Sequence, residues 1–255
     1  MIYEDLKGKS VIVTGSSRRV GIGAAICRAF AEQGSNVFFT TYSRYDAQMD
    51  WGADEGGADA LLEELRAGVK AGRLEVDLST PDAAGKVLEE AGTTIGEPDI
   101  LVNNATYSTR DGFEKLDAAT LDAHYAVNMR GAFLLSVGFA KGFTKGAGGR
   151  IINLSSGQGT GPMPGELAYA ATKGAVEAFT RTLAHEVAPL GITVNAVDPG
   201  ATDTGWMMPE FKRALADASQ FGRVGVPEDA ARLIVFLASE AAQWLTGQVI
   251  HSRGI

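Results

Sequence analysis

Tyr169 and Lys173 are the two residues whose types and spacing point most directly to chemistry. They stand four positions apart in a stretch with helical periodicity, so their side chains project from one face, one above the other. An ammonium group beside a phenol favours the phenolate and lowers the pKa of the tyrosine, which is ordinarily about 10. Tyr169 is therefore predicted to act as a general acid or base.

Two serines precede this pair at the end of a predicted strand. Ser155 and Ser156 lie 14 and 13 residues before Tyr169. Doubly wound sheets build their sites at the carboxyl ends of strands, and a hydroxyl there can hydrogen-bond a substrate carbonyl.

A glycine-rich segment follows the first predicted strand and precedes a predicted helix. Glycines permit a tight turn and let backbone N–H groups approach a pyrophosphate, whose charge the helix dipole favours. The alternative is a glycine-rich turn that binds nothing. The candidate cofactor-binding residues of this segment are Gly15, Ser17, Arg18, Arg19, Gly21 and Ile22.

The end of the second predicted strand indicates which dinucleotide would bind. An NAD-selective site places Asp or Glu there to hold the adenosine ribose, whereas this strand ends in Thr-Thr-Tyr, the last being Tyr42. Arg18, Arg19 and Arg44 lie on segments that should converge near the ribose, where a guanidinium suits a 2′-phosphate. The sequence predicts NADP(H), with NAD(H) as the alternative, and each arginine has solvation as its other interpretation.

The elements that must position these residues alternate between short β-branched runs and helical stretches. This alternation favours βαβ units and predicts a single-domain α/β fold over residues 1–255, a Rossmann-like doubly wound parallel sheet of about seven strands with helices on both faces. The segment 42–57 has no clear period and is predicted to be a surface excursion. The predicted strands cover residues 11–14, 36–41, 73–77, 100–103, 150–154, 193–197 and 248–250.

Composition excludes several classes of protein. The net charge of −8 opposes binding to a nucleic acid, and no apolar run is long enough for a membrane span. The single cysteine, Cys27, excludes an internal disulfide, and the acidic start MIYEDLKGKS does not resemble a secretory signal, so a cytoplasmic location is expected. The three histidines have no metal-ligand spacing, and no metal site is predicted.

Many residues in order along the chain match one family. They are the Thr-Gly start of the glycine loop, Asp77-Leu78, Asn103-Asn104-Ala105, Asn128, Ser156, Tyr169 with Lys173, Pro199-Gly200 with Thr204, and Leu245-Thr246-Gly247-Gln248. With these residues the whole chain resembles the short-chain dehydrogenase/reductase family, and most of all its 3-oxoacyl-(acyl carrier protein) reductase branch.

The resemblance implies catalytic roles that agree with the spacing argument. Tyr169 would exchange a proton with the substrate oxygen, while Lys173 would depress its pKa and hold the nicotinamide ribose. Ser156 would orient the carbonyl, and Asn128 would keep a proton-relay water. Hydride would pass between nicotinamide C4 and the substrate carbon.

The resemblance also implies contacts with the rest of the cofactor. Asp77, followed by Leu78, would face the adenine, and Asn104 and Ala105 would border the adenosine ribose. The residues that would flank the carboxamide are Thr202 and Thr204, which follow Pro199 and Gly200. For Asn103 the favoured interpretation is structural, a tie between neighbouring strands.

Two departures from the family pattern lie near the cofactor. Five residues rather than three separate Gly15 from Gly21, so either Arg18 or Arg19 is a candidate for the phosphate. Thr106 stands where the family has glycine and adds a side chain to that wall.

The resemblance also implies a substrate lid at about residues 201–222, where this chain has an apolar stretch of methionine and aromatic residues. Lining an apolar substrate is preferred there over simple packing. The candidate substrate contacts are Tyr107, Met163, Trp206 and Met207.

The leading functional prediction is an NADPH-dependent reductase of a small-molecule carbonyl, with a 3-oxoacyl thioester, free or carried on an acyl carrier protein, as best guess. One alternative is a dehydrogenase of a sugar, polyol or secondary-metabolite alcohol, and another is a dinucleotide sensor without turnover. An enoyl reductase is disfavoured, because that group spaces its Tyr and Lys further apart and Ala175 stands six residues after Tyr169. The resemblance further implies a homodimer or homotetramer that pairs helices around residues 116–143 and 169–188.

Overall fold

Seven short extended segments form one parallel sheet in the computed structural model, which describes residues 2–252. Residues 1 and 253–255, the ends of the predicted 1–255 domain, lie outside that range. The strand order is β3-β2-β1-β4-β5-β6-β7 with every pairing parallel, which confirms the predicted doubly wound fold. The strands are β1 (Ser10–Val13), β2 (Asn36–Thr41), β3 (Ala71–Glu75), β4 (Ile100–Asn103), β5 (Gly149–Leu154), β6 (Ile192–Asp198) and β7 (Val249–His251).

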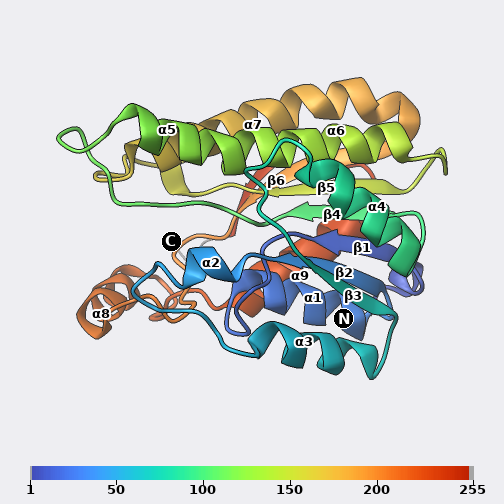
Figure 1. Cartoon of the computed structure of the whole chain (residues 1–255), viewed down its shortest axis with the longest axis horizontal. Coiled ribbons are helices and arrows are strands. Elements are labelled where there is room, and N and C mark those ends of the chain that lie inside the picture. Colours follow the sequence, from blue (N-terminus) through green and yellow to red (C-terminus); the bar gives the residue numbers. More distant parts are fainter. Residues whose placement is uncertain (1, 253–255) are drawn as a thin grey trace.

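Helices cover both faces of the sheet, which is why the central strands are buried throughout instead of alternating between buried and exposed residues. Figure 1 shows α1, α3 and α9 below the sheet and α4, α5, α6 and α7 above it. The helices are α1 (Ile22–Glu32), α2 (Ser43–Asp46), α3 (Gly57–Arg66), α4 (Ala83–Ile95), α5 (Ala118–His124), α6 (Ala132–Gly142), α7 (Leu167–Val187), α8 (Pro209–Ala218) and α9 (Pro227–Ala238).

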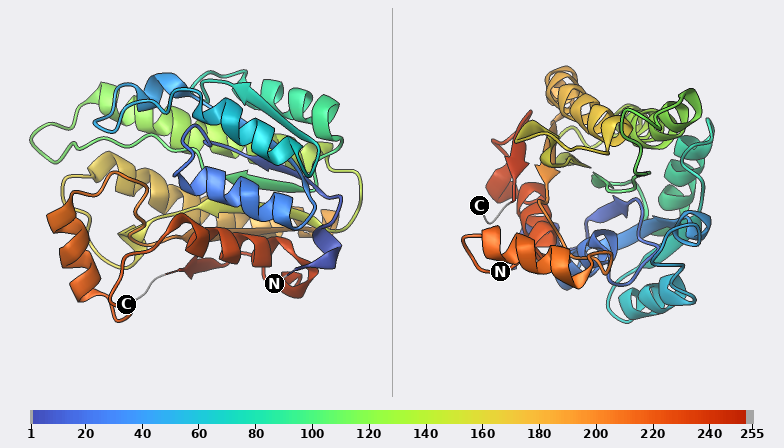
Figure 2. Two further views of the ribbon diagram at one scale, coloured as in Figure 1. Left: turned by 90° about the horizontal axis from the view of Figure 1, so that it is seen from below. Right: turned by 90° about the vertical axis from the view of Figure 1, so that its left-hand side faces the viewer.

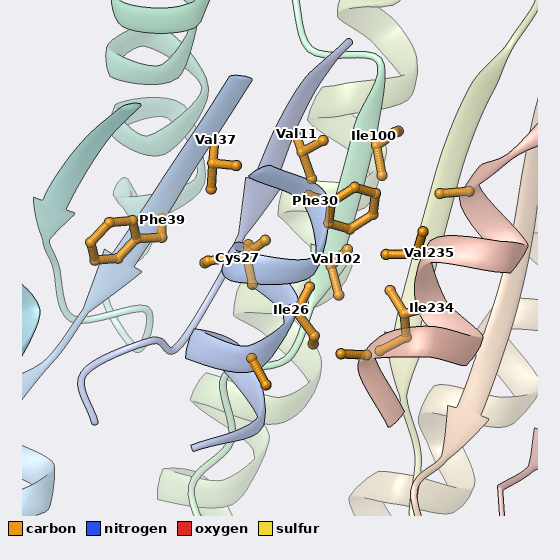
Figure 3. Packing of buried hydrophobic residues seen from close by; sticks show 14 of the residues in the cluster. Val11, Ile26, Cys27, Phe30, Val37, Phe39, Ile100, Val102, Ile234 and Val235 are labelled. Carbon is orange, nitrogen blue, oxygen red and sulfur yellow. The ribbon is translucent and has the colours of Figure 1, made fainter. Parts of the chain in front are cut away.

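The core beneath the sheet is built by α1 and α9, which pack side by side. Phe30 of α1 and Ile234 of α9 are fully buried against the strands that carry Val11 and Val102 (Figure 3). Cys27 lies in the same core, where burial raises the pKa of its thiol to about 12. The thiol is therefore packed and unreactive.

The order of the strands sets the position of the site. Successive strands are added on one side of β1 up to β3 and on its other side from β4 onward, so the strand order reverses between β1 and β4. Doubly wound sheets bind ligands outside the carboxyl ends of the strands at such a point. Beyond those ends lie α2 and α8, at the same end of the molecule in Figure 1 and in the left view of Figure 2. The predicted excursion at 42–57 therefore forms α2, a set of turns and the first residue of α3 over the carboxyl edge of the sheet.

Candidate functional site

The loop between β1 and α1 depends on glycine at two positions. Gly15 has a φ of +75°, and a Cβ there would lie 2.6 Å from the Cα of Ala105. A Cβ on Gly23 would lie 2.5 Å from the Gly15 carbonyl oxygen. The Asn104 amide donates to the carbonyl oxygens of Thr14 and Gly15, both at 2.8 Å. The loop is thus held against β4, with a bare backbone at the start of a helix, as phosphate-binding loops require.

A cavity of about 640 Å³ lies between this loop and the residues that follow β2, β3 and β4. Its size is within the range of roughly 300–1,000 Å³ that is usual for small-molecule and cofactor sites. The residues predicted to bind a cofactor that line it are Gly15, Ser17, Arg18, Gly21, Ile22, Tyr42, Asp77, Leu78, Asn104, Ala105 and Thr204. An elongated set of loops at the switch point of a doubly wound sheet fits a dinucleotide.

The other predicted residues of the Pro-Gly turn have a different position. Pro199, Gly200 and Thr202 do not line this cavity. Thr202 is buried, and its hydroxyl donates to the Pro199 carbonyl at 3.1 Å. These three residues shape the turn that presents Thr204 to the cavity.

Hydroxyl groups connect the glycine loop to the ends of β2 and β3. The Ser17 hydroxyl accepts a hydrogen bond from the Tyr42 amide at 2.9 Å. The Tyr42 phenol is hydrogen-bonded to the Asp77 carboxylate, which also accepts from the Ser79 amide at 2.8 Å. This polar wall provides several groups that can bind an adenosine and its ribose.

The structure separates the two arginines that the sequence left as alternatives. The Arg18 guanidinium lines the cavity, donates to the Thr204 carbonyl at 2.8 Å and lies 5.1 Å from the centre of the Trp51 ring. Arg19 does not line the cavity, and its guanidinium lies 3.4 Å from the Glu64 carboxylate on the surface. Of the two, Arg18 is therefore placed to meet a ligand.

Asp46 places a carboxylate where the end of β2 predicted none. It belongs to α2, is buried, lines the cavity and accepts a hydrogen bond from the Trp51 indole at 3.0 Å. Burial raises the pKa of this carboxyl. The end of β2 itself has no carboxylate, as expected, but the 42–57 segment folds back over the cavity and adds the Asp46 carboxylate to its wall.

Tyr169 and Ser156 come together at the carboxyl end of β5. Ser156 follows that strand, Tyr169 is in the first turn of α7, and their hydroxyls are hydrogen-bonded. Lys173 lies one turn further along α7, with its ammonium 5.5 Å from the centre of the Tyr169 ring. The ammonium donates to the Leu154 carbonyl at 2.7 Å. The structure thus brings together all three predicted groups.

The acidity of the phenol differs from the expectation. Burial raises the pKa of Tyr169 to about 12, although part of the residue remains accessible and the Ser156 hydroxyl acts in the opposite direction. Burial also lowers the pKa of Lys173 to about 8. In this structure the predicted depression of the Tyr169 pKa by Lys173 is therefore absent, because desolvation outweighs the effect of a neighbouring ammonium that is hydrogen-bonded elsewhere.

Asn128 lies in a π-helical turn (Tyr125–Gly131) between α5 and α6. Its side-chain oxygen accepts from the Tyr107 amide at 2.7 Å and the Thr106 hydroxyl at 3.2 Å. Its amide donates to the Tyr107 carbonyl at 2.9 Å and the Thr172 hydroxyl at 3.0 Å. These four bonds use the full hydrogen-bonding capacity of the side chain. The expected role of Asn128 in keeping a proton-relay water stays a prediction. The side chain ties the cavity wall to α7.

Asn103 has the structural role that was favoured for it. Its side-chain amide donates to Asn153 on β5 and to Ser136 on α6, both at 2.8 Å. The residue thus joins two neighbouring strands to a covering helix.

Asp111 is a residue of the site that sequence reasoning missed. Its carboxylate accepts from the amides of Leu167 and Ala168, both at 2.8 Å, at the start of α7. The local candidate for this cap, Glu166, makes no side-chain capping bond. No signal near the helix could have found Asp111, because the cap comes from a loop 56 residues away in the sequence.

The predicted substrate contacts are divided between two places. Tyr107 lines the cavity, and its ring packs 5.5 Å from that of Tyr45. Met163, Trp206 and Met207 do not line it. The Trp206 ring instead packs 5.8 Å from Phe211 of α8.

Within residues 2–252 no group of three or more His, Cys, Asp or Glu side chains could hold a metal ion. Over the same part of the chain, no helix combines the length and apolar character that crossing a membrane requires.

Comparison with known proteins gives consistent relatives over nearly the full chain. Residues 15–254 match the family described as enoyl-(acyl carrier protein) reductase. The chain is 51% identical to the uncharacterized oxidoreductase YjdA of Bacillus subtilis (strain 168), with 96% of each protein covered. It is 35% identical to the 3-oxoacyl-(acyl-carrier-protein) reductase FabG of Aquifex aeolicus (strain VF5), with 98% of this chain and 97% of that protein covered.

A solved structure is also similar to this chain in both fold and sequence. A short chain dehydrogenase from Burkholderia cenocepacia J2315 in complex with NADP has a TM-score of 0.86 and 31% identity to this chain, with 98% of each chain covered. The likeness therefore extends over nearly the whole of both chains.

Proposed function

The chain belongs to the short-chain dehydrogenase/reductase family, and we propose that it uses NADPH to reduce the ketone of a small molecule to a secondary alcohol. Membership makes it an NAD(P)-dependent oxidoreductase that acts on CH–OH groups. The observation that carries the proposed activity is the hydrogen-bonded pair of Ser156 and Tyr169, in which the phenol is protonated at neutral pH. A protonated phenol is ready to give a proton to a carbonyl oxygen, as reduction requires.

The residues of the chain have separate tasks in this proposal. Bound NADPH supplies the hydride. Tyr169 donates a proton from its phenol oxygen to the substrate oxygen, and Ser156 donates a hydrogen bond that orients the same oxygen. Lys173 keeps a positive charge beside the phenol and stabilises the phenolate left after proton transfer. The glycine loop, the Asn104 region and the wall of Tyr42 and Asp77 hold the dinucleotide.

The preference for NADP(H) over NAD(H) rests on Arg18. Its guanidinium is at the cavity, whereas Arg19 is paired with Glu64 outside it. A guanidinium suits a 2′-phosphate. A related short chain dehydrogenase is known in complex with NADP, which supports the same choice.

A 3-oxoacyl thioester, free or on an acyl carrier protein, is the proposed substrate class. A relative named as a 3-oxoacyl-(acyl-carrier-protein) reductase supports it. So does the proposed lid, about residues 201–222, whose apolar side chains Met208, Phe211 and Phe221 are exposed as an acyl-binding cover would need. Enoyl reduction is the second candidate activity, because the matching family is described as an enoyl-(acyl carrier protein) reductase. The spacing of Tyr169 and Lys173 argues against it.

The test follows NADPH consumption with an acetoacetyl thioester, a cyclic ketone and a 2-enoyl thioester, and NADP⁺ reduction with polyols. We expect turnover of the acetoacetyl thioester, and Tyr169→Phe should lower it by orders of magnitude while NADPH binding stays nearly intact. The control is Tyr125→Phe, an exposed tyrosine on the π-helical turn. Turnover of the enoyl thioester alone, or unchanged activity in Tyr169→Phe, would contradict the proposal.

We also propose a cytoplasmic homodimer or homotetramer. The buried, unpaired Cys27 fits a reducing compartment. Exposed Leu134 on α6 and Leu167 on α7 fit a subunit contact at the helices expected to pair. Light scattering at micromolar concentration should give a mass above 26.7 kDa, and a monomer would contradict the assembly.

A further inference from the structure

The Arg18 end of the cavity contains charges of both signs. Arg18 comes from the glycine loop, and Asp46 comes from α2 in the excursion that follows β2. Both line the cavity, and the two charges influence each other. A second carboxylate, Glu75 at the end of β3, does not line the cavity but also acts electrostatically on Asp46. The positive charge of Arg18 is therefore offset by carboxylates.

Trp51 holds this pair in place. Its indole N–H donates to Asp46 at 3.0 Å, and its ring lies 5.1 Å from the Arg18 guanidinium. The Ser17 hydroxyl is also hydrogen-bonded to Asp46. Two hydrogen bonds therefore hold the Asp46 carboxylate in the cavity wall.

We propose that Asp46 is a specificity-determining residue that limits the preference for NADPH over NADH by placing a fixed negative charge beside Arg18 in the cavity wall. This inference rests on the proposed function, in which a dinucleotide occupies the cavity. NADPH differs from NADH only by its 2′-phosphate. Arg18 attracts that group and Asp46 repels it, so their opposition sets how far the two affinities differ.

The burial of Asp46 makes the repulsion effective. Only 7% of the residue surface is exposed, so water and salt screen its charge weakly. A surface carboxylate of the same segment would have little effect, because its charge is screened. Asp50 provides that comparison, since it is exposed and does not line the cavity.

Asp46→Asn tests the charge alone, since the asparagine oxygen can still accept from the Trp51 indole. Dissociation constants for NADPH and NADH are measured by calorimetry on the full-length wild type, Asp46→Asn and the matched control Asp50→Asn. We expect Asp46→Asn to bind NADPH roughly tenfold more tightly and NADH within about twofold of wild type. Asp50→Asn should leave both constants within about twofold.

Each other result has a definite meaning. Unchanged or weaker NADPH binding in Asp46→Asn overturns the inference. Weaker NADH binding with unchanged NADPH binding also overturns it, because Asp46 would then be a ligand of the ribose hydroxyl. If Asp46→Asn does not fold, Asp46→Ser is titrated in the same way. Failure of wild type to bind either dinucleotide would instead sink the proposed function, which separates the two failures.

Discussion

The Lys173 ammonium lies 5.5 Å from the centre of the Tyr169 ring, yet it donates its hydrogen bond to the Leu154 carbonyl at 2.7 Å. The two residues are neighbours on α7 but have opposite shifts, because burial raises the pKa of the phenol and lowers that of the amine. Desolvation disfavours the charged form of each group. Keeping the buried Lys173 ammonium charged beside Tyr169 therefore lowers the free energy of unfolding.

Lys173→Met should reveal this cost. The folded pKa of about 8 lies below the ordinary 10.5, so the unfolded chain binds the proton more tightly. The penalty is complete below pH 8 and disappears as the pH rises toward 10.5. We expect the ligand-free variant to unfold with a free energy roughly 2 kcal/mol higher than wild type at pH 7, after allowance for the lost hydrogen bond.

Urea unfolding of both proteins at several pH values between 7 and 10 measures that difference. It should shrink steadily as the pH rises, while the variant has lost reductase activity. A variant less stable than wild type at pH 7 would show that burying the Lys173 ammonium does not destabilise the fold.

The two arginines of the glycine loop should have unequal effects on coenzyme binding. Arg18→Ala removes a cation at the cavity and should raise the NADPH dissociation constant by about tenfold or more, with little change for NADH. Arg19→Ala is the matched control and should leave both constants within about twofold, since Arg19 faces Glu64. Calorimetric titration decides the matter, and a larger effect of Arg19→Ala would reverse the assignment.

Asp111→Ala should loosen the start of the helix that carries Tyr169. Burial raises the pKa of Asp111, but hydrogen bonds from the amides of Ala168, Gly112 and Leu167 outweigh it and lower the pKa below its usual value. The loss of these bonds should cost about 2 kcal/mol of unfolding free energy and reduce kcat. Urea unfolding and initial rates measure the two effects.

The difference in unfolding free energy between wild type and Asp111→Ala should depend on pH. Because the folded pKa is lowered, the contribution is complete above the unfolded value of about 4 and is lost as the pH falls through the folded pKa. Asp117→Ala is the control, since Asp117 caps the exposed start of α5 and should cost stability without reducing kcat. Equal loss of kcat in both variants would contradict a specific role for Asp111.

Gly15→Ala should abolish dinucleotide binding as well as reduce stability. The positive φ costs about 1–2 kcal/mol for alanine, and the new Cβ would lie 2.6 Å from Ala105. Gly8→Ala separates the two effects, because Gly8 has a φ of +77° with nothing within 4 Å of the added atom. Thermal unfolding should show a smaller loss for Gly8→Ala, with NADPH binding unchanged. Normal binding by Gly15→Ala would show that the loop can move away from β4.

Local pattern was enough to predict the sheet and the glycine loop. Each predicted strand boundary lies within two residues of an observed one, because most of the strands are apolar runs bounded by turn residues. The meeting of Ser156 with Tyr169 followed from the same logic, since both lie near the carboxyl end of β5.

Features that depend on tertiary structure could not be predicted in this way. Asp46 enters the cavity wall only because the aperiodic 42–57 segment turns back over the sheet. The cap from Asp111 crosses between loops that are distant in the sequence. The spacing of Tyr169 and Lys173 identifies neighbours, but burial sets their pKa values, and burial is a property of the assembled core.

The reversal of strand order beside β1 also bears on how relatives of this enzyme can diverge. Apart from Thr204, every residue around the cavity precedes residue 131, whereas Ser156, Tyr169 and the exposed apolar side chains of α8 come later. Recombination between homologous genes near the middle of the chain would exchange one half and keep the other. Descendants could thus acquire new substrates while inheriting a single coenzyme.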